Sequence, residues 1–511
     1  MRLHSDSILK ARVNRDRGKS VVDFVEEAQP SIRPLSLSPT KDLLKGMMQV
    51  CWPYFDPEFD SLVEKYHGPR VCIDNENLED CTVVKVDSAN KKGLLLDVVQ
   101  ALTEMDLIIT KGYVSSDAGW FMDVFHVTDQ LGHKVTDKRL VNYIEQAITE
   151  RRYNPESGEI TTCLGNVVGS ESAPDLTVIE MTAGDRPGIF SEISAVLNEL
   201  GCNVIAAHMW THNARLACIV YVIDESTSSP IEDPSRLADI QDHLSTVLKA
   251  SDDQQGGRSA STWFNNSRIA CTDRRLHQLM LADRDFEQVR SRWSPHASDR
   301  AEADGFRQSN GMNIVIDSCK EKGYSVVNIR CKDRPKLMFD TVCTLTDMQY
   351  VAFHATITSH GPFAYQEYYI RHVDGSTLDT ESEKQRVIKC LEAAIERRVC
   401  EGIRVELCTS RRSDLLSEAT RLLRENGLSV VRADVSTHGQ KSKNVFYVRD
   451  ASGNAVDMKA LESIRRGMRP WVVKVKDVHL RSGSPERQRF SIGGMLKSQF
   501  ERFSHEFISI R

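Results

Sequence analysis

The sequence lacks the motifs by which the common enzyme and membrane classes are recognised. Its 511 residues contain no Gly-x-Ser-x-Gly, no Walker loop and no Gly-x-Gly-x-x-Gly after a strand-like run. The apolar runs are far shorter than the about 20 residues that span a bilayer. Residues 1–20 are polar and carry no apolar core of a secretory signal. We therefore expect no catalytic residues, no cofactor and no transmembrane segment.

Cysteine spacing and charge exclude further classes. The 13 cysteines form no Cys-x-x-Cys pair, which is typical of reduced thiols in a cytoplasmic or nuclear protein. His208 and His212 are four residues apart, but they lie on a strand-like run and its turn, so they do not predict a metal site. The net charge of −6 argues against direct binding to nucleic acid.

The sequence does contain a fourfold repeat centred on one turn. Its clearest copy is Asp185-Arg-Pro-Gly188, which lies between a strand-like run at 176–181 and a helix-like run at 189–200. The same position is held by Asn90–Gly93, Asp333–Lys336 and Arg411–Asp414 in the other copies. Such internal repetition outranks any single motif in deciding the fold.

Each copy has the order β-α-β-β-α. In the second copy Ile189, Ile193 and Leu197 recur at helical spacing. The pattern predicts an α+β fold of four tandem ferredoxin-like βαββαβ units with antiparallel sheets. The short runs 71–74 and 314–317 are expected to supply the edge strands that units one and three otherwise lack.

Units of this size are marginal alone, so we expect them to pair. The pairing suggested by a duplicated two-unit block is unit one with unit two and unit three with unit four, and a homo-oligomer or a protein partner is expected as well. The expected organisation is a disordered extension at 1–45, a lead segment at 46–80, unit one at 81–151, unit two at 176–250, a linker with one helix at 251–311, unit three at 325–398, unit four at 402–470, and a basic tail with an amphipathic helix at 471–511.

Two segments outside the units have helical patterns. The linker helix is expected from Arg274 to Val289. The tail helix carries an apolar stripe at Leu496, Phe500, Phe503 and Phe507. That stripe docks onto the protein's own core in one interpretation, and onto a partner or an anionic membrane surface in the other.

Four such units with variants of Asp-Arg-Pro-Gly resemble ACT domains. Four stretches are similar in particular to the plant ACT-domain-repeat proteins, and they are Pro53–Phe59, Gly119–Asp129, Gly323–Asn328 and Lys497–His505. The resemblance runs from about Gly46 to the end of the sequence. It implies four tandem ACT units and a regulatory protein without catalysis of its own, with a free amino acid as its ligand.

The turn of unit two has the chemistry to bind an amino acid. A helix N-terminus offers unpaired N–H groups and a partial positive charge to a carboxylate. Gly184 and Gly188 permit close approach to the backbone, and Pro187 suits the first helical turn. Asp185 can cap the helix or accept a hydrogen bond from a ligand ammonium. In ACT domains an asparagine at the position of Asn203 often comes from a neighbouring domain, so the resemblance implies a site at an interface.

The candidate ligand-binding residues are Gly184, Asp185, Arg186, Pro187, Gly188, Ile189 and Asn203 of unit two, Asn90 and Gly93 of unit one, and Asp333 of unit three. Lys336 replaces the glycine in unit three and Arg411 replaces the acid in unit four, so these two units are expected to be more structural. The same turn also makes a well-capped connection from strand to helix without any ligand.

Three functions follow as hypotheses. The first is a sensor in which an amino acid binds between paired units and changes their association. The second is an interaction scaffold that dimerises through its repeats without a ligand. The third is an enzyme of a kind that leaves no recognisable motif.

Overall fold

The computed structural model describes most of the repeat region. The described residues are 69–89, 93–117, 120–150, 160–161, 167–168, 176–249, 260–265, 269, 271–287, 311–399, 403–410, 414–438, 441–452, 456–467 and 472–477. The expected N-terminal extension and the tail helix lie outside these residues. Among the described helices, none is both long and apolar enough to cross a bilayer.

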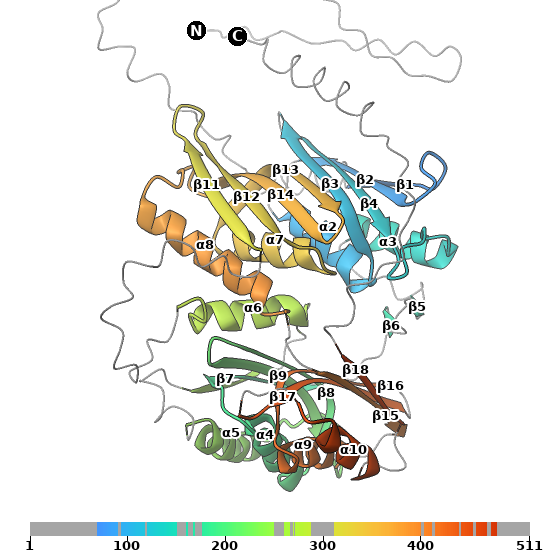
Figure 1. Ribbon diagram of the computed structural model, residues 1–511, viewed down its shortest axis with the longest axis vertical. Helices are drawn as coiled ribbons and strands as arrows, with labels where there is room; N and C mark the ends of the chain where they lie inside the picture. The colour runs from blue at the N-terminus through green and yellow to red at the C-terminus, as the bar shows by residue number, and fades with distance from the viewer. Residues whose placement is uncertain are drawn as a thin grey trace, which may run out of the picture. The chain divides into compact units, whose positions relative to one another are not determined.

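The first sheet has eight antiparallel strands in the order β1-β2-β4-β3-β13-β14-β12-β11 (Figure 1). The strands are β1 (Arg70–Asp74), β2 (Thr82–Ala89), β3 (Ile108–Asp117), β4 (Trp120–Thr128), β11 (Asn313–Cys319), β12 (Tyr324–Lys332), β13 (Tyr350–His360) and β14 (Phe363–His372). The helices on one of its faces are α2 (Leu94–Glu104), α3 (Lys138–Glu150), α7 (Leu337–Asp347) and α8 (Glu381–Glu396).

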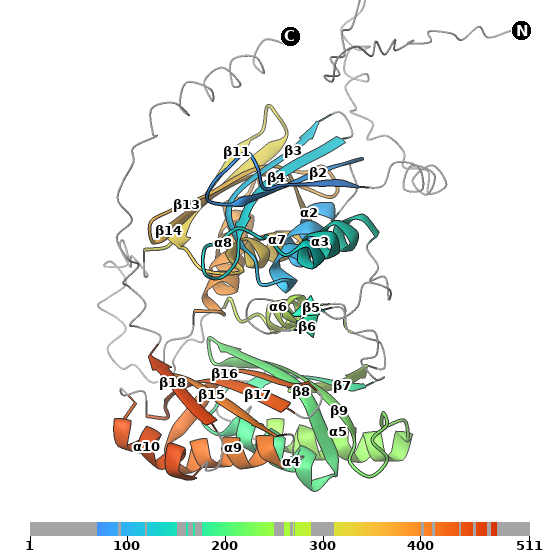
Figure 2. The same cartoon turned by 90° about the vertical axis from the view of Figure 1, so that its right-hand side faces the viewer.

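The second sheet repeats this plan in the order β10-β7-β9-β8-β16-β17-β15-β18. Its strands are β7 (Thr177–Gly184), β8 (Cys202–His212), β9 (Arg215–Asp224), β10 (Ser261–Asn265), β15 (Ile403–Ser410), β16 (Leu428–His438), β17 (Lys441–Asp450) and β18 (Val472–Asp477). Its helices are α4 (Ile189–Glu199), α5 (Pro234–Lys249), α9 (Leu415–Glu425) and α10 (Met458–Gly467), all on one face (Figure 2). A small hairpin of β5 (Ile160–Thr161) and β6 (Val167–Val168) stands apart from both sheets.

These elements confirm the α+β fold of ferredoxin-like units with antiparallel sheets. Unit one comprises β1–β4, unit two β7–β10, unit three β11–β14 and unit four β15–β18, each with two helices. The edge strands expected at 71–74 and 314–317 are present as β1 and β11. In units two and four the edge strand instead follows the second helix, as β10 and β18.

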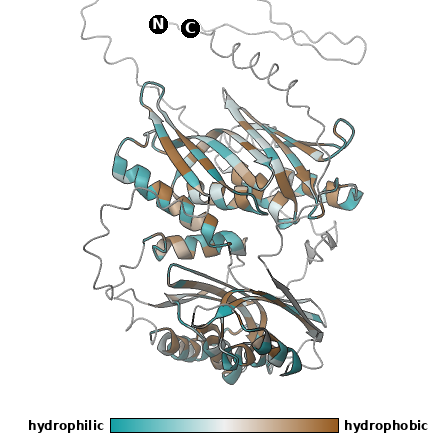
Figure 3. Cartoon of the chain, viewed as in Figure 1, coloured by the Kyte–Doolittle hydropathy of each residue, from teal (hydrophilic) through white to brown (hydrophobic). Residues whose placement is uncertain are grey.

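The expected pairing of neighbouring units is wrong. Unit one pairs with unit three through β3 and β13, from Lys111 opposite Thr358 to Ser115 opposite His354. Unit two pairs with unit four through β8 and β16. The units with a leading edge strand thus pair with each other, as do those with a trailing one. We call these two strand pairings, β3 with β13 and β8 with β16, the seams. One continuous apolar cluster runs beneath each seam, because the helices α2 and α7, and likewise α4 and α9, lie side by side. Figure 3 shows apolar residues in brown along the strands and the helix faces packed on them.

A linker helix, α6 (Thr272–Ala282), joins the second sheet to the helices of unit three (Figures 1 and 2). It is shorter than the expected span of Arg274 to Val289, because the chain turns at Asp283 to Glu287. Leu276 and Met280 pack against Trp210 on the face of the second sheet that α4 does not cover. This contact buries the apolar stripe of α6, whose packing partner could not be predicted from the sequence of the linker.

The opposite side of α6 is held by buried charges. Burial lowers the pKa of His277, so a neutral ring donates from Nε2 to Asp340 at 2.8 Å and accepts from Arg397 at Nδ1. Arg397 also donates twice to the buried Asp285, at 2.7 and 2.6 Å. The guanidinium of Arg398 lies 4.5 Å from the ring centre of Trp210. Because every charge is paired, the desolvation penalty is offset and the contact is specific.

The pairing of units one with three and two with four predicts how the chain behaves when cut. We expect residues 1–300 or 301–511 alone to aggregate, since each half exposes the long strand edges that the other half covers. Coexpressed halves should copurify as a 1:1 complex with the mass of the intact chain. Size-exclusion chromatography with light scattering measures this. Two stable monomeric halves would contradict the pairing.

Candidate functional site

The turn of unit two connects the fully buried strand β7 to α4. The N–H of Asp185 donates to the carbonyl of Ala214 at 2.8 Å, which closes the turn against the β8–β9 hairpin. Gly188 occupies the left-handed region with φ of 84°, and it precedes Ile189, the first residue of α4. No side chain caps this helix. Within the described part of the chain, the N–H groups of Phe190 and Ser191 have no acceptor, so the helix N-terminus is available to an anion.

Arg186 holds the turn in place through its ion pair with the first turn of α4. Its guanidinium forms a two-point ion pair with Glu192 in the first turn of α4 and also donates to the carbonyl of Val247. Arg334 of unit three pairs in the same way with Asp340, again six residues later. The recurrence of an acid at this spacing was visible in the sequence but was not used to assign the arginine a structural role.

The carboxylate of Asp185 is buried without a full set of hydrogen-bond and ion-pair partners. Its side chain is 8% exposed. Oδ2 lies 3.4 Å from Nη2 of Arg449, while Oδ1 has no hydrogen-bond partner among the described residues. Burial raises the pKa of this carboxyl to about 6, against the opposing effects of Arg449, of the Thr211 hydroxyl and of the Arg186 N–H. A buried carboxylate oxygen without a donor is costly to the fold, so this geometry suits a ligand that brings the donor.

Unit four supplies the other half of this site across the β8–β16 seam. Arg449 comes from β17, where it is paired in register with the buried Ser429. Arg424 comes from α9, and its Cδ lies 2.8 Å from the position that a Cβ on Gly188 would take. A hydrogen bond of 2.7 Å between Ser194 and Thr420 ties α4 to α9 beneath them. The two arginines stand beside Asp185 and the N-terminus of α4.

The structure separates Asn203 from the turn of its own unit. Asn203 opens β8 and pairs with Ile223, whereas Gly184 pairs with Arg215 at the opposite end of β9. Because β8 and β16 are antiparallel, the start of β8 lies near the end of β16. That is the end of the sheet at which the turn of unit four lies. Residues 411–413 of that turn lie outside the described residues. The residues of another unit that lie beside Asp185 and Gly188 are therefore those of unit four.

The turn of unit three is closed by ion pairs. Lys336 adopts φ of 66°, which is strained for a residue with a side chain, and its Nζ pairs with Asp273 of α6 at 2.8 Å. Asp333 lines a cavity of about 20 Å³ with Gln366, Ile108 and Ile109. That volume holds about one water molecule and no amino acid.

The turns of units one and four are described only in part. Gly93 has φ of 84° and no atom within 4 Å of an added Cβ, so its surroundings are open. Asn90 lies outside the described residues. Asp414 precedes α9 in a right-handed conformation, unlike the other three turns. No group of three or more potential metal ligands occurs among the described residues.

Comparison with known proteins identifies the fold units and the family. The model described as ACR family N-terminal ACT domain matches residues 77–155, and the model described as ACT domain matches residues 177–245. ACT domain-containing protein ACR2 of Arabidopsis thaliana is 52% identical, over 90% of this chain and 99% of that protein. ACT domain-containing protein ACR3 of the same plant is 51% identical, over 89% of this chain and 98% of that protein. The chain belongs to the ACR family of ACT domain-containing proteins.

Membership in the ACR family confirms the resemblance read from the repeats. Its ACT domains are regulatory domains of the amino-acid-binding type, and the family is not a catalytic one. Among solved structures, an aspartate kinase from Synechocystis aligns with 78% of this chain and 55% of its own at 12% identity, and its TM-score of 0.13 carries no argument.

The raised pKa of Asp185 predicts a pH-dependent stability. The folded state holds this proton more tightly than the unfolded chain, whose aspartate pKa is near 3.8. The carboxyl therefore favours folding below pH about 4, and this contribution is lost as the pH rises through about 6, by at most about 3 kcal/mol. Asp185→Asn does not ionise, so its stability relative to the unmodified chain should increase between pH 4 and 7.

Urea unfolding of both proteins at several pH values measures this difference. An Asp185→Asn variant that is less stable by about 1 kcal/mol at pH 7 would show that the carboxylate acts as a structural cap.

Proposed function

We propose that this ACR protein is a non-catalytic sensor that binds a free amino acid at the turn Asp185–Gly188, between units two and four. The observation that carries the proposal is the buried Oδ1 of Asp185, which has no donor among the described residues. An ammonium group supplies that donor. The N-terminus of α4 with Arg424 and Arg449 offers positive charge to the ligand carboxylate.

Signalling would follow from the position of the ligand at a seam. A molecule that contacts both Gly188 and the side chain of Arg424 stabilises the pairing of unit two with unit four. A change in this pairing alters the surfaces that the repeats present to a second copy or to a protein partner. Asn203 would serve the turn of unit four in the corresponding way.

The alternative is a scaffold that associates without a ligand. The observation that favours it is the bracing of the turn by Arg186 and Glu192, which holds the loop in place with no ligand present. Arg424 also covers Gly188, so a ligand must contact or displace that side chain. The sensor and the scaffold differ in whether amino acids change stability.

A thermal-shift series with the twenty amino acids separates the two functions. We expect one or a few to stabilise the unmodified chain in a dose-dependent manner. Asp185→Asn should weaken that binding by about tenfold to a hundredfold, because it removes a charge-assisted hydrogen bond. Asp333→Asn is the matched control, since the same position in unit three faces a cavity too small for an amino acid.

A response that Asp333→Asn leaves intact and Asp185→Asn reduces would support the proposed site. No response at millimolar concentrations, with self-association unchanged, would favour the scaffold.

A further inference from the structure

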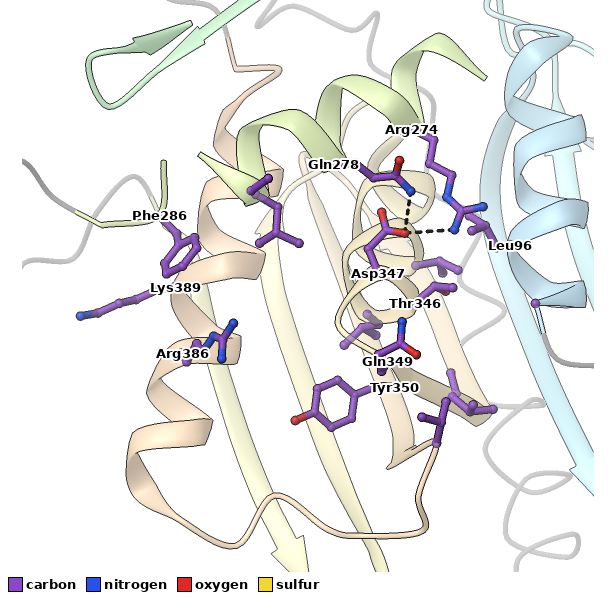
Figure 4. Close-up of a pocket in the computed structure, with 18 of the residues that line it drawn as sticks. Leu96, Arg274, Gln278, Phe286, Thr346, Asp347, Gln349, Tyr350, Arg386 and Lys389 are labelled. Atoms are coloured by element: carbon purple, nitrogen blue, oxygen red, sulfur yellow. Dashed lines mark hydrogen bonds and ion pairs between the residues drawn. The ribbon is translucent and has the colours of Figure 1, made fainter. Parts of the chain in front are cut away.

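A large cavity lies on the helix side of the first sheet, at the seam between units one and three. Its volume is about 1250 Å³. The surrounding elements are α2, α6, α7, α8 and the start of β13 (Figure 4). Gly93 of the unit-one turn lies at its border. This space exceeds what a free amino acid fills and matches or exceeds the pockets of drug-sized molecules.

One wall carries an ion pair between a buried aspartate and a partly exposed arginine, with unused hydrogen-bonding atoms. Asp347, at the end of α7, is 9% exposed in its side chain. Its Oδ1 accepts from Arg274 at 3.0 Å and from Gln278 at 3.1 Å, both on α6. Its Oδ2 has no partner among the described residues, and neither has the buried Nε of Arg274. A free acceptor and a free donor on one ion pair suit an amide group, whose N–H donates to Oδ2 and whose C=O accepts from Nε.

The opposite wall is cationic. In Figure 4 the guanidinium of Arg386 and the ring of Tyr350 point into the space, and Lys389 extends away from it. Arg386 is exposed. Burial and the charges of Glu383 and Asp374 raise the pKa of Tyr350, while Arg386 lowers it. Arg284 on the rim is already paired with Glu287. A guanidinium beside a phenol hydroxyl is a donor set for a carboxylate.

Apolar side chains make up another part of the lining. Leu96, Val342, Leu345 and Phe286 line the cavity and provide no hydrogen-bonding groups of their own. We propose that this cavity binds a short peptide with a free carboxyl terminus. A peptide bond pairs with Asp347 and Arg274, the terminal carboxylate pairs with Arg386 and Tyr350, and the side chains rest on the apolar residues.

Other ligand classes fit this arrangement less well. Most free amino acids have no amide to satisfy both unused atoms, and asparagine and glutamine, which have one, would still leave most of the volume empty. A nucleotide places its phosphates against a glycine-rich loop or a helix N-terminus together with cations. The N-terminus of α2 borders this cavity at Gly93, but Arg386 comes from the middle of α8. The peptide site uses α6, which belongs to none of the four units, and it does not depend on amino-acid binding at Asp185.

Calorimetric titration of the full chain with dipeptides and tripeptides tests the proposal. We expect binding of some peptides, and at least tenfold weaker binding of the same peptides with amidated carboxyl termini. Arg386→Gln should cause a similar loss. Lys384→Gln is the matched control, because it removes one charge from the same helix without lining the cavity. Asp347→Asn should also weaken binding, since its amide offers a donor where the peptide N–H needs an acceptor.

Three outcomes would overturn the peptide site. The first is no heat of binding with any peptide at millimolar concentration. The second is binding of nucleotides with the same dependence on Arg386. The third is peptide binding that Asp185→Asn abolishes and Arg386→Gln leaves unchanged, which would move the peptides to the unit-two turn. Retained peptide binding in Asp185→Asn supports a peptide site that is separate from the unit-two turn, whether or not amino acids bind at that turn.

Discussion

The arrangement of this protein depends on two antiparallel seams, β3 with β13 and β8 with β16. Each seam extends two four-stranded sheets into one and merges the cores beneath them, so no unit has to bury its apolar face alone. The seams also decide where ligands can meet residues from two units. The turn at Asp185 faces Arg424 and Arg449 of unit four, although more than 200 positions separate them in the sequence. The large cavity lies at the other seam, and its composite walls come from the same constraint.

The two Asp-Arg-Pro turns show how one local structure serves different purposes. In both, the arginine pairs with an acid six residues later. In unit three, Lys336 and the paired charges around Asp340 fix the turn to α6, and the space left holds about one water molecule. In unit two the glycine is retained and the aspartate keeps one oxygen unpaired. Buried charges that are fully paired stabilise a contact, whereas a buried charge left without a partner lowers stability unless a ligand completes it.

Much of the fold could be predicted from the sequence because its signals are local. Helical spacing marked α4, the turn repeated in each copy marked the four units, and the run 71–74 was correctly expected at a sheet edge. The pairing of units could not be predicted, since main-chain hydrogen bonds at a free edge carry little sequence information. The candidate site was therefore only half predicted. Asp185 and Gly188 were identified from their own turn. Asn203 lies at the opposite end of the sheet from that turn, and Arg449 was missed because it comes from another unit.

The contacts around α6 place the two proposed sites in one continuous structure. Ala214 accepts the hydrogen bond from the N–H of Asp185, while the preceding residues, His212 and Asn213, both bond to Asp285 in the turn that follows α6. The same helix presents Arg274 and Gln278 to the large cavity. A ligand that shifts the unit-two turn thus acts on a hairpin that holds α6, and α6 forms a wall of the second site.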